Sequence, residues 1–203
     1  MKKSRFALRY FISALTICLA CATVGFAQTP VPPKKGVVAK PTVNKVMEEW
    51  RRNWVSEWER ARDYTKEYLD AMPEDGLGFK PDPKIRSFAE QMLHLASANF
   101  TFASAAAGTT SPYTPQALAQ KEDLRQSKAA LTKVVIESYD FMMSSVKSMN
   151  LLKAGEELKL FDRFATTRSG AIAKAFEHQT HHRGQMTIYL RLKGVTPPAE
   201  KLF

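Results

Sequence analysis

Hydrophobic positions recur every three to four residues over four long stretches of the chain, and almost no stretch alternates like a β-strand. Prolines at helix starts, hydroxyl residues at caps and glycines beyond helix ends mark the boundaries. A shorter helix is expected over about residues 156–164. Together these features predict an all-α four-helix bundle. The long helices are expected at about residues 42–72, from Pro83 to just before Gly108, from Pro115 to about Met149, and from Thr166 or Thr167 to Gly194.

The first predicted helix carries a regular aromatic face. Three tryptophans lie four residues apart, so they project from the same side of the helix. A stripe at this spacing is typical of a buried helix face. We therefore expect it in the core, where it could also form the wall of a cavity. The face consists of Trp50, Trp54, Trp58, Ala61, Thr65 and Tyr68.

The first 41 residues do not follow the pattern of the bundle. Residues 1–27 combine a short basic start, an uncharged stretch of 17 residues and small residues before a cleavage site at their end. This is typical of a secretory signal peptide and predicts an exported protein, periplasmic or extracellular. Residues 28–41 contain four prolines and are expected to form a linker, so the folded domain spans residues 42–203. Two alternatives are a membrane anchor and a lipid anchor at Cys21.

Composition restricts the function further. Two cysteines are too few for a disulfide scaffold or a Cys-based zinc finger. Cleavage of the signal would remove both, together with four cationic residues and no acidic one, which lowers the formal net charge from +10 to +6. The remaining cations are spread along the helices without a basic block interleaved with aromatics. We therefore expect no nucleic-acid partner, and no stable membrane span after cleavage.

Histidines are the strongest candidates for chemistry. The chain has four, and three of them, His178, His181 and His182, lie within five residues of the last predicted helix. Residues four apart share a helix face, so two imidazoles at this spacing can bind one metal ion. Three pairs compete: His178 with His182, His178 with His181, and Glu177 with His181.

The apolar stripe of the same helix favours one pair. At about 100° per residue, His182 falls near the centre of this stripe and His178 at its edge. His181 and Glu177 point largely outward. We therefore expect His178 and His182 to face the bundle interior. The stripe runs through Ala171, Ala175, Met186 and Tyr189.

A metal ion would explain two inward histidines, because unpaired buried imidazoles are costly. The fourth histidine, His94, lies on the second predicted helix beside its apolar stripe and could supply a third ligand. The alternative is a set of core histidines that hydrogen bonds satisfy, with no metal. Imidazole suits zinc or nickel, which we expect first, and is compatible with iron or manganese.

Three segments resemble the DinB family, a family of DinB/YfiT-like metalloenzymes. The resemblance implies an up-down-down-up four-helix bundle, commonly a homodimer, with three histidines on one divalent metal ion. Carried over position by position, these ligands are His94, His178 and His182. The segments are AMPEDGLGFKP over residues 71–81, RSFAEQMLHLASAN over residues 86–99 and EHQTHHRGQMTIYLRLKGVTPP over residues 177–198.

Characterised members of this family include thiol-dependent transferases and a mycothiol-dependent maleylpyruvate isomerase. Low-molecular-weight thiols are mainly cytoplasmic, so the predicted export signal disfavours thiol transfer here. The sequence therefore predicts an exported metal-dependent hydrolase or transferase that acts on an unidentified small molecule. The alternative is a non-catalytic metal-binding or interaction bundle.

Catalytic residues are not assigned by the sequence. His181, Gln91 and Asn99 are candidates for a base or a hydrogen-bond partner near the metal. Arg183 and Gln185 belong to the family motif, and we expect them to support the structure or the ligands. Gly184 lies opposite the core stripe, which would suit the close approach of another segment or a dimer contact.

Overall fold

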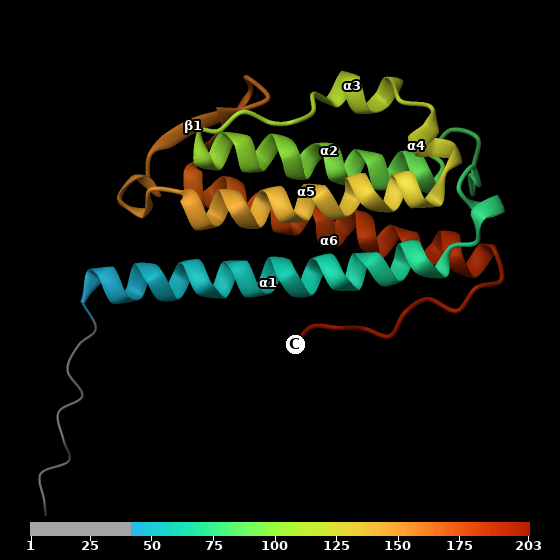
Figure 1. Ribbon diagram of the computed structural model, residues 1–203, viewed down its shortest axis with the longest axis horizontal. Coiled ribbons are helices and arrows are strands. Elements are labelled where there is room, and N and C mark those ends of the chain that lie inside the picture. Colours follow the sequence, from blue (N-terminus) through green and yellow to red (C-terminus); the bar gives the residue numbers. More distant parts are fainter. Residues whose placement is uncertain (1–41) are drawn as a thin grey trace, which may run out of the picture. The chain divides into compact units, whose positions relative to one another are not determined.

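Four long helices pack side by side in the computed structural model, which describes residues 42–203 (Figure 1). Residues 1–41, which hold the predicted signal peptide and linker, lie outside the described residues. Within the described part, no helix is long and apolar enough to span a bilayer. The elements are α1 (Val43–Ala71), η1 (Glu74–Gly76), α2 (Phe88–Ala107), α3 (Pro115–Gln120), α4 (Asp123–Gln126), α5 (Lys128–Ser148), η2 (Leu151–Lys153), β1 (Glu157–Leu160), β2 (Phe164–Thr167) and α6 (Arg168–Leu192).

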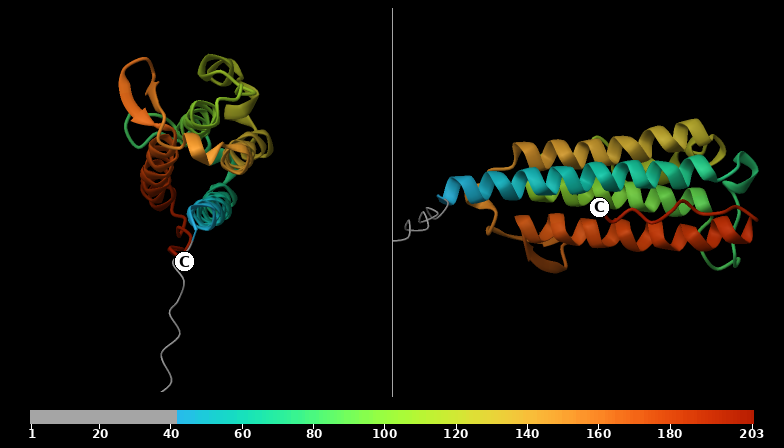
Figure 2. Two further views of the ribbon diagram at one scale, coloured as in Figure 1. Left: turned by 90° about the vertical axis from the view of Figure 1, so that its left-hand side faces the viewer. Right: turned by 90° about the horizontal axis from the view of Figure 1, so that it is seen from below.

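The directions of the long helices follow the predicted order. Helices α1 and α6 run one way and α2 and α5 the other, so the bundle is up-down-down-up (Figure 1). Helix α2 packs against α5 and α6, and α1 packs against the same two helices. Helices α1 and α2 are therefore diagonal, as the end-on view of Figure 2 shows. Because α2 and α5 are parallel, residues 108–127 must cross over between them, and they do so along α2.

The crossover divides what the sequence predicts as one helix over residues 115–149. Three helices, α3, α4 and α5, form instead. Lys121 ends α3 in an extended conformation, and Ser127 does the same at the end of α4. Ser127 then caps α5, because its hydroxyl accepts a hydrogen bond from the Ala130 N–H. Leu118 and Leu124 are buried and fix the two short helices to the bundle.

Helix α2 begins later than Pro83, where the sequence predicts its start. Ser87 caps it, and the Glu90 carboxylate accepts a hydrogen bond from the Ser87 N–H in return, a reciprocal capping box. The residues before Ser87 form a loop, which Tyr189 fastens to α6 by donating to the Arg86 carbonyl at 2.7 Å. This loop later forms one wall of the site.

The predicted short helix over residues 156–164 is wrong. Strands β1 and β2 form an antiparallel hairpin there, with Leu160 opposite Phe164. Burial alternates along β1, with Leu160 buried and Lys159 exposed, which is the period of a strand and not of a helix. Phe161 and Asp162 turn the chain with φ of 54° and 55°, the left-handed geometry of a tight hairpin turn.

The aromatic stripe of α1 lies partly in the core, as predicted. Trp58 is fully buried, whereas Trp50 and Trp54 are partly buried against the core cluster. Phe176 of α6 packs edge-on against Trp54 at 5.5 Å and Trp58 at 5.4 Å between ring centroids. These contacts close the side of the bundle between α1 and α6.

Candidate metal centre

Three histidines from two neighbouring helices converge in the bundle. His94 comes from α2, and His178 and His182 lie one turn apart on α6. One ring nitrogen from each lies within 4.8 Å of the other two. The Nε2 atoms of His178 and His182 are 3.1 Å apart. In the described part of the chain, no Asp, Glu or further His side chain completes this group.

His94 reaches the group although it lies beside the apolar stripe of its own helix. Helix α2 packs against both α5 and α6, so its buried surface is wider than one stripe. The ring centroid of His94 lies 4.6 Å from that of His182 and 5.1 Å from that of His178. An edge position on α2 therefore faces α6.

The donor set fits a divalent metal ion. Two imidazole nitrogens that bind one ion at about 2.0–2.1 Å stand about 3 Å apart, close to the separation of the His178 and His182 Nε2 atoms. The other ring nitrogen of His178, Nδ1, is buried and has no hydrogen-bond partner among residues 42–203. Hydrogen bonds within the protein thus leave this imidazole cluster incompletely satisfied.

Burial lowers the pKa of all three imidazoles. The pKa of His182 falls to about 3 and that of His178 to about 4, mainly because burial removes solvent, with the neighbouring imidazoles adding to the effect. The pKa of His94 is lowered by burial and then by the positive charge of Arg86. All three rings are therefore neutral at pH 7, which is the form that binds a metal ion.

Gln185 orients His182. Its Oε1 atom accepts a hydrogen bond from Gln91 Nε2 and lies 3.1 Å from His182 Nδ1. An oxygen at this position makes Nδ1 the protonated nitrogen of His182 and leaves the lone pair of Nε2 free. The Gln185 Nε2 atom lies 3.0 Å from His181 Nε2 and can donate to it. The predicted supporting role of Gln185 thus has a definite contact.

The other two pairings from the sequence do not form such a group. Glu177 is exposed, and its carboxylate pairs with Lys174 at 2.8 Å. His181 is exposed and lies beside His182, with ring centroids 5.0 Å apart. The structure therefore brings together His178 and His182 and leaves Glu177 at the surface.

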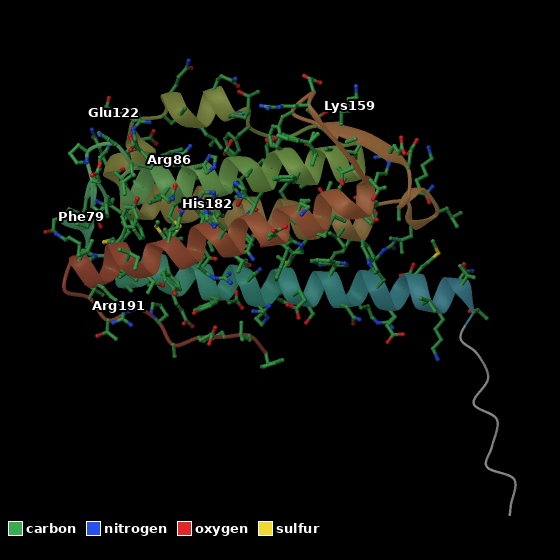
Figure 3. The ribbon with its side chains drawn as sticks, turned by 180° about the vertical axis from the view of Figure 1, so that it is seen from behind. Phe79, Arg86, Glu122, Lys159, His182 and Arg191 are labelled. Carbon is green, nitrogen blue, oxygen red and sulfur yellow. The ribbon has the colours of Figure 1, made fainter. Side chains whose placement is uncertain are left out.

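A cleft of about 1100 Å³ opens beside the histidines. His94 and His182 are part of its wall, together with Gln91, Gln185 and His181. Its remaining walls are the loop before α2, the crossover helix α3, Arg125 of α4 and the end of α6. Figure 3 shows Arg86, from that loop, near His182 in the view from behind. The aromatic stripe of α1 does not contribute to this cleft, so the cavity wall expected there is not formed by it.

Asn99 and Gly184 differ from what the sequence suggests. Asn99 is fully buried and donates to Ser138 at 3.2 Å, away from the residues that line the cleft. A Cβ atom on Gly184 would meet no described atom within 4 Å, so no described segment of the chain approaches it. A dimer contact at Gly184 stays a prediction.

Arg183 belongs to a different, enclosed cluster on α6. Its guanidinium donates to Gln179 Oε1 at 2.8 Å and lies 4.5 Å from the centre of the Tyr64 ring. Tyr139, which is fully buried, donates to the same Gln179 oxygen at 3.0 Å and shares a hydrogen bond with Thr65 at 2.7 Å. These contacts give Arg183 the structural role that the sequence suggests.

Sequence reasoning missed the cations that line the cleft. Lys80, Lys84 and Arg86 precede α2, and Arg125 lies about forty residues later in the crossover. Nothing in their spacing marks them as neighbours, because the crossover alone brings α4 back over the start of α2. They could not have been grouped without the tertiary structure.

Comparisons with known proteins agree with this arrangement. The sequence model of the DinB family matches residues 44–202. The chain belongs to the DinB family. It is similar to the uncharacterised DinB-like protein YjoA of Bacillus subtilis strain 168, with 25% identity over 143 residues, covering 70% of this chain and 90% of YjoA.

Solved structures of the DinB family share the fold. The crystal structure of B. subtilis YjoA superposes with a TM-score of 0.57 at 19% identity, over 74% of this chain and 96% of that one. A DinB-like protein from Bacillus cereus ATCC 10987 gives a TM-score of 0.51 at 17% identity, over 74% of this chain and 97% of that one. The three close histidines could hold a metal ion in this DinB bundle.

Proposed function

We propose that this DinB-family protein is exported and binds one divalent metal ion, zinc or nickel first, through His94, His178 and His182. It acts on a small molecule as a metal-dependent hydrolase or transferase. The observation that carries the proposal is the convergence of three neutral imidazoles, with ring nitrogens within 4.8 Å of one another, two of which, His94 and His182, line an open cleft.

The cleft favours a reactive site over a closed structural one. When bound, a divalent ion with three neutral ligands supplies a Lewis acid that can polarise a carbonyl or phosphoryl group and lower the pKa of a water ligand to about 7. No carboxylate or thiolate of residues 42–203 approaches to fill a fourth position. A substrate in the cleft can therefore reach the centre directly.

Residues of the chain support this chemistry in distinct ways. Gln185 fixes the tautomer of His182, and Gln91 fixes the orientation of Gln185. His181 lies on the cleft wall next to His182, where it can accept or release a proton during a reaction. Phe102 packs against His178, with ring centroids 6.0 Å apart, and against Phe161 of the hairpin turn at 5.6 Å.

Metal analysis tests the proposal. The protein is purified without an affinity tag or chelator, and its metal content is measured by mass spectrometry of the elements. We expect about one equivalent, lost in the His178→Ala/His182→Ala variant. His181→Ala is the matched control, because it removes an imidazole from the same turn of α6 and should retain the metal. No metal in the wild type, and no uptake of added zinc or nickel, would contradict the proposal.

Export and assembly need separate measurements. The N-terminal sequence predicts a mature chain that begins at Gln28, which mass spectrometry of the protein recovered outside the cytoplasm would detect. An intact N-terminus in the cytoplasm would contradict export. The homodimer expected for a DinB protein predicts twice the chain mass in light scattering, and the mass of one chain would contradict it.

A further inference from the structure

The geometry points to a small-molecule substrate that carries a carboxylate or phosphate group, held in the cleft by Arg86 and Arg125. This inference rests on the proposed function, because it names the class of molecule on which the metal centre acts. It adds an anion-binding part to the cleft next to the histidines.

The lining of the cleft is strongly cationic. Four cations and one acidic residue, Glu90, line it. Glu90 already accepts a hydrogen bond from the Ser87 N–H at 2.8 Å and pairs with Lys80 at 3.1 Å. These contacts lower its pKa, so it stays ionised and neutralises Lys80. The cations that remain are Lys84, Arg86 and Arg125, and none of them has an acidic partner within the described chain.

Both arginines line the same cleft, and their backbones are held in place. The backbone of Arg86 is fixed by the Tyr189 hydrogen bond to its carbonyl, and that of Arg125 by the buried Leu124 beside it. Arg125 uses one guanidinium N–H on the Ala119 carbonyl at 2.6 Å, and a guanidinium has five. Planar guanidinium groups match the two oxygens of a carboxylate or phosphate, which flexible lysines do not.

Gln91, in the wall of the cleft next to the histidines, carries a hydrogen-bond acceptor that has no donor among residues 42–203. Gln91 is 7% exposed, and its Oε1 is buried with no hydrogen-bond partner in the described chain. Its orientation follows from the metal centre: a free Nε2 on His182 requires the oxygen of Gln185 at Nδ1, and that oxygen requires the nitrogen of Gln91. The Gln91 oxygen is thus an unsatisfied acceptor in a residue of the cleft wall.

The volume of the cleft indicates how large the acidic substrate is. A volume of about 1100 Å³ far exceeds one carboxylate or phosphate group and is at the upper end of small-molecule sites. The acidic group is therefore one end of a larger molecule, whose other end lies against His94 and His182. With the proposed metal ion bound, both ends of the molecule would meet a positive environment, which disfavours cationic substrates.

Calorimetric titration with inorganic phosphate and with succinate tests the inference. We expect at least one of the two to bind, and Arg86→Gln and Arg125→Gln each to weaken binding at least about tenfold, because each removes a charge-assisted contact. Phosphate binding alone assigns a phosphate ester, and succinate binding alone a carboxylate. The matched control is Lys159→Gln on the hairpin, which loses the same charge away from the cleft and should bind normally (Figure 3).

The same titrations on the His178→Ala/His182→Ala variant separate this inference from the metal centre. Arginine-dependent binding that persists there supports the anion site even if the metal proposal fails. Circular dichroism confirms that each variant is folded. The inference is overturned if the metal-loaded protein binds neither anion, or if Lys159→Gln weakens binding as much as the arginine variants do.

Discussion

Helix α6 carries two polar pairs, each spaced four residues apart, that have different surroundings although one member of each is buried to a similar degree. His182 and Arg183 are 7% and 5% exposed. The pair Gln179 and Arg183 faces α1 and α5, where hydrogen bonds from Tyr139 and to the Ala61 carbonyl satisfy it. The pair His178 and His182 faces α2 and the cleft, and a buried nitrogen is left without a partner.

The difference separates a structural cluster from a binding site. Buried polar groups that bond to one another within the protein hold helices in position, whereas imidazole nitrogens that converge beside a cleft can bind a ligand. Gln179 and Arg183 each follow His178 and His182 by one residue on α6, and this single step places them against tyrosines instead of imidazoles. We call the side of α6 with Gln179 and Arg183 the enclosed face, and the side with His178 and His182 the open face. The comparison predicts that substitutions on the enclosed face reduce stability and that those on the open face reduce ligand binding.

The largest expected effect is on the enclosed face. Arg183→Met leaves the Gln179 oxygen and the Tyr64 ring without their cation and should lower the free energy of unfolding by about 3 kcal/mol. Urea denaturation of the metal-free protein measures it. The matched change on the other face, His178→Leu, should cost less than about 1 kcal/mol in the same assay, because the buried Nδ1 atom that it removes has no hydrogen-bond partner in the described chain. Equal losses would remove the distinction between the faces.

Gln185 tests the open face. Gln185→Leu removes the acceptor at His182 Nδ1 and should weaken metal affinity about 10- to 100-fold while the protein stays folded. Competition with a zinc-binding dye measures the affinity. Gln185→Glu keeps an acceptor at the same place and should preserve most of it. Unchanged affinity in Gln185→Leu would mean that His182 does not need this contact.

The pH dependence of the metal-free protein reports on the same histidines. Their folded pKa values, about 3 and about 4, lie below the usual 6.5, so the unfolded chain binds protons that the folded chain does not. Stability is therefore complete above pH 6.5 and falls as the pH is lowered toward 4. Urea denaturation at several pH values in this range measures the free energy of unfolding. Its dependence on pH should be weaker in the His178→Ala/His182→Ala variant, and an unchanged dependence would contradict burial of neutral imidazoles.

The smallest expected effect lies outside both faces, in the hairpin turn. Asp162 has a φ of 55°, where glycine is favoured, so Asp162→Gly should raise the free energy of unfolding by about 0.5 kcal/mol. Metal affinity should not change. Thermal unfolding with and without zinc measures both quantities, and a change in metal affinity would show that the hairpin takes part in the site.

The sequence predicts the four-helix bundle and two of the three clustered histidines from local patterns alone. The apolar periodicity and the cap at Thr167 are local features, so they can be read along the chain, whereas the cap at Ser127 lies inside the single helix that the periodicity predicts and is missed. His178 and His182 are found for the same reason, because they share one helix face. The hairpin is missed because a four-residue strand contains only two inward positions, here Leu158 and Leu160.

The rest depends on contacts between distant segments. That His94 faces α6 follows from α2 packing between two helices, and the resemblance to the DinB family indicates it where periodicity alone does not. That Arg86 and Arg125 line the same cleft depends on the path of the crossover, which no local pattern encodes. Local periodicity therefore predicts which side chains share a helix face, but not which loops meet over it.

Anomalous diffraction from crystals grown with zinc tests the central claim most directly. A difference map at the zinc edge should show one peak in the bundle, about 2 Å from a ring nitrogen of each of His94, His178 and His182, with its open side toward the cleft. A peak that contacts only one of these rings, or no peak in the bundle at all, would contradict the account.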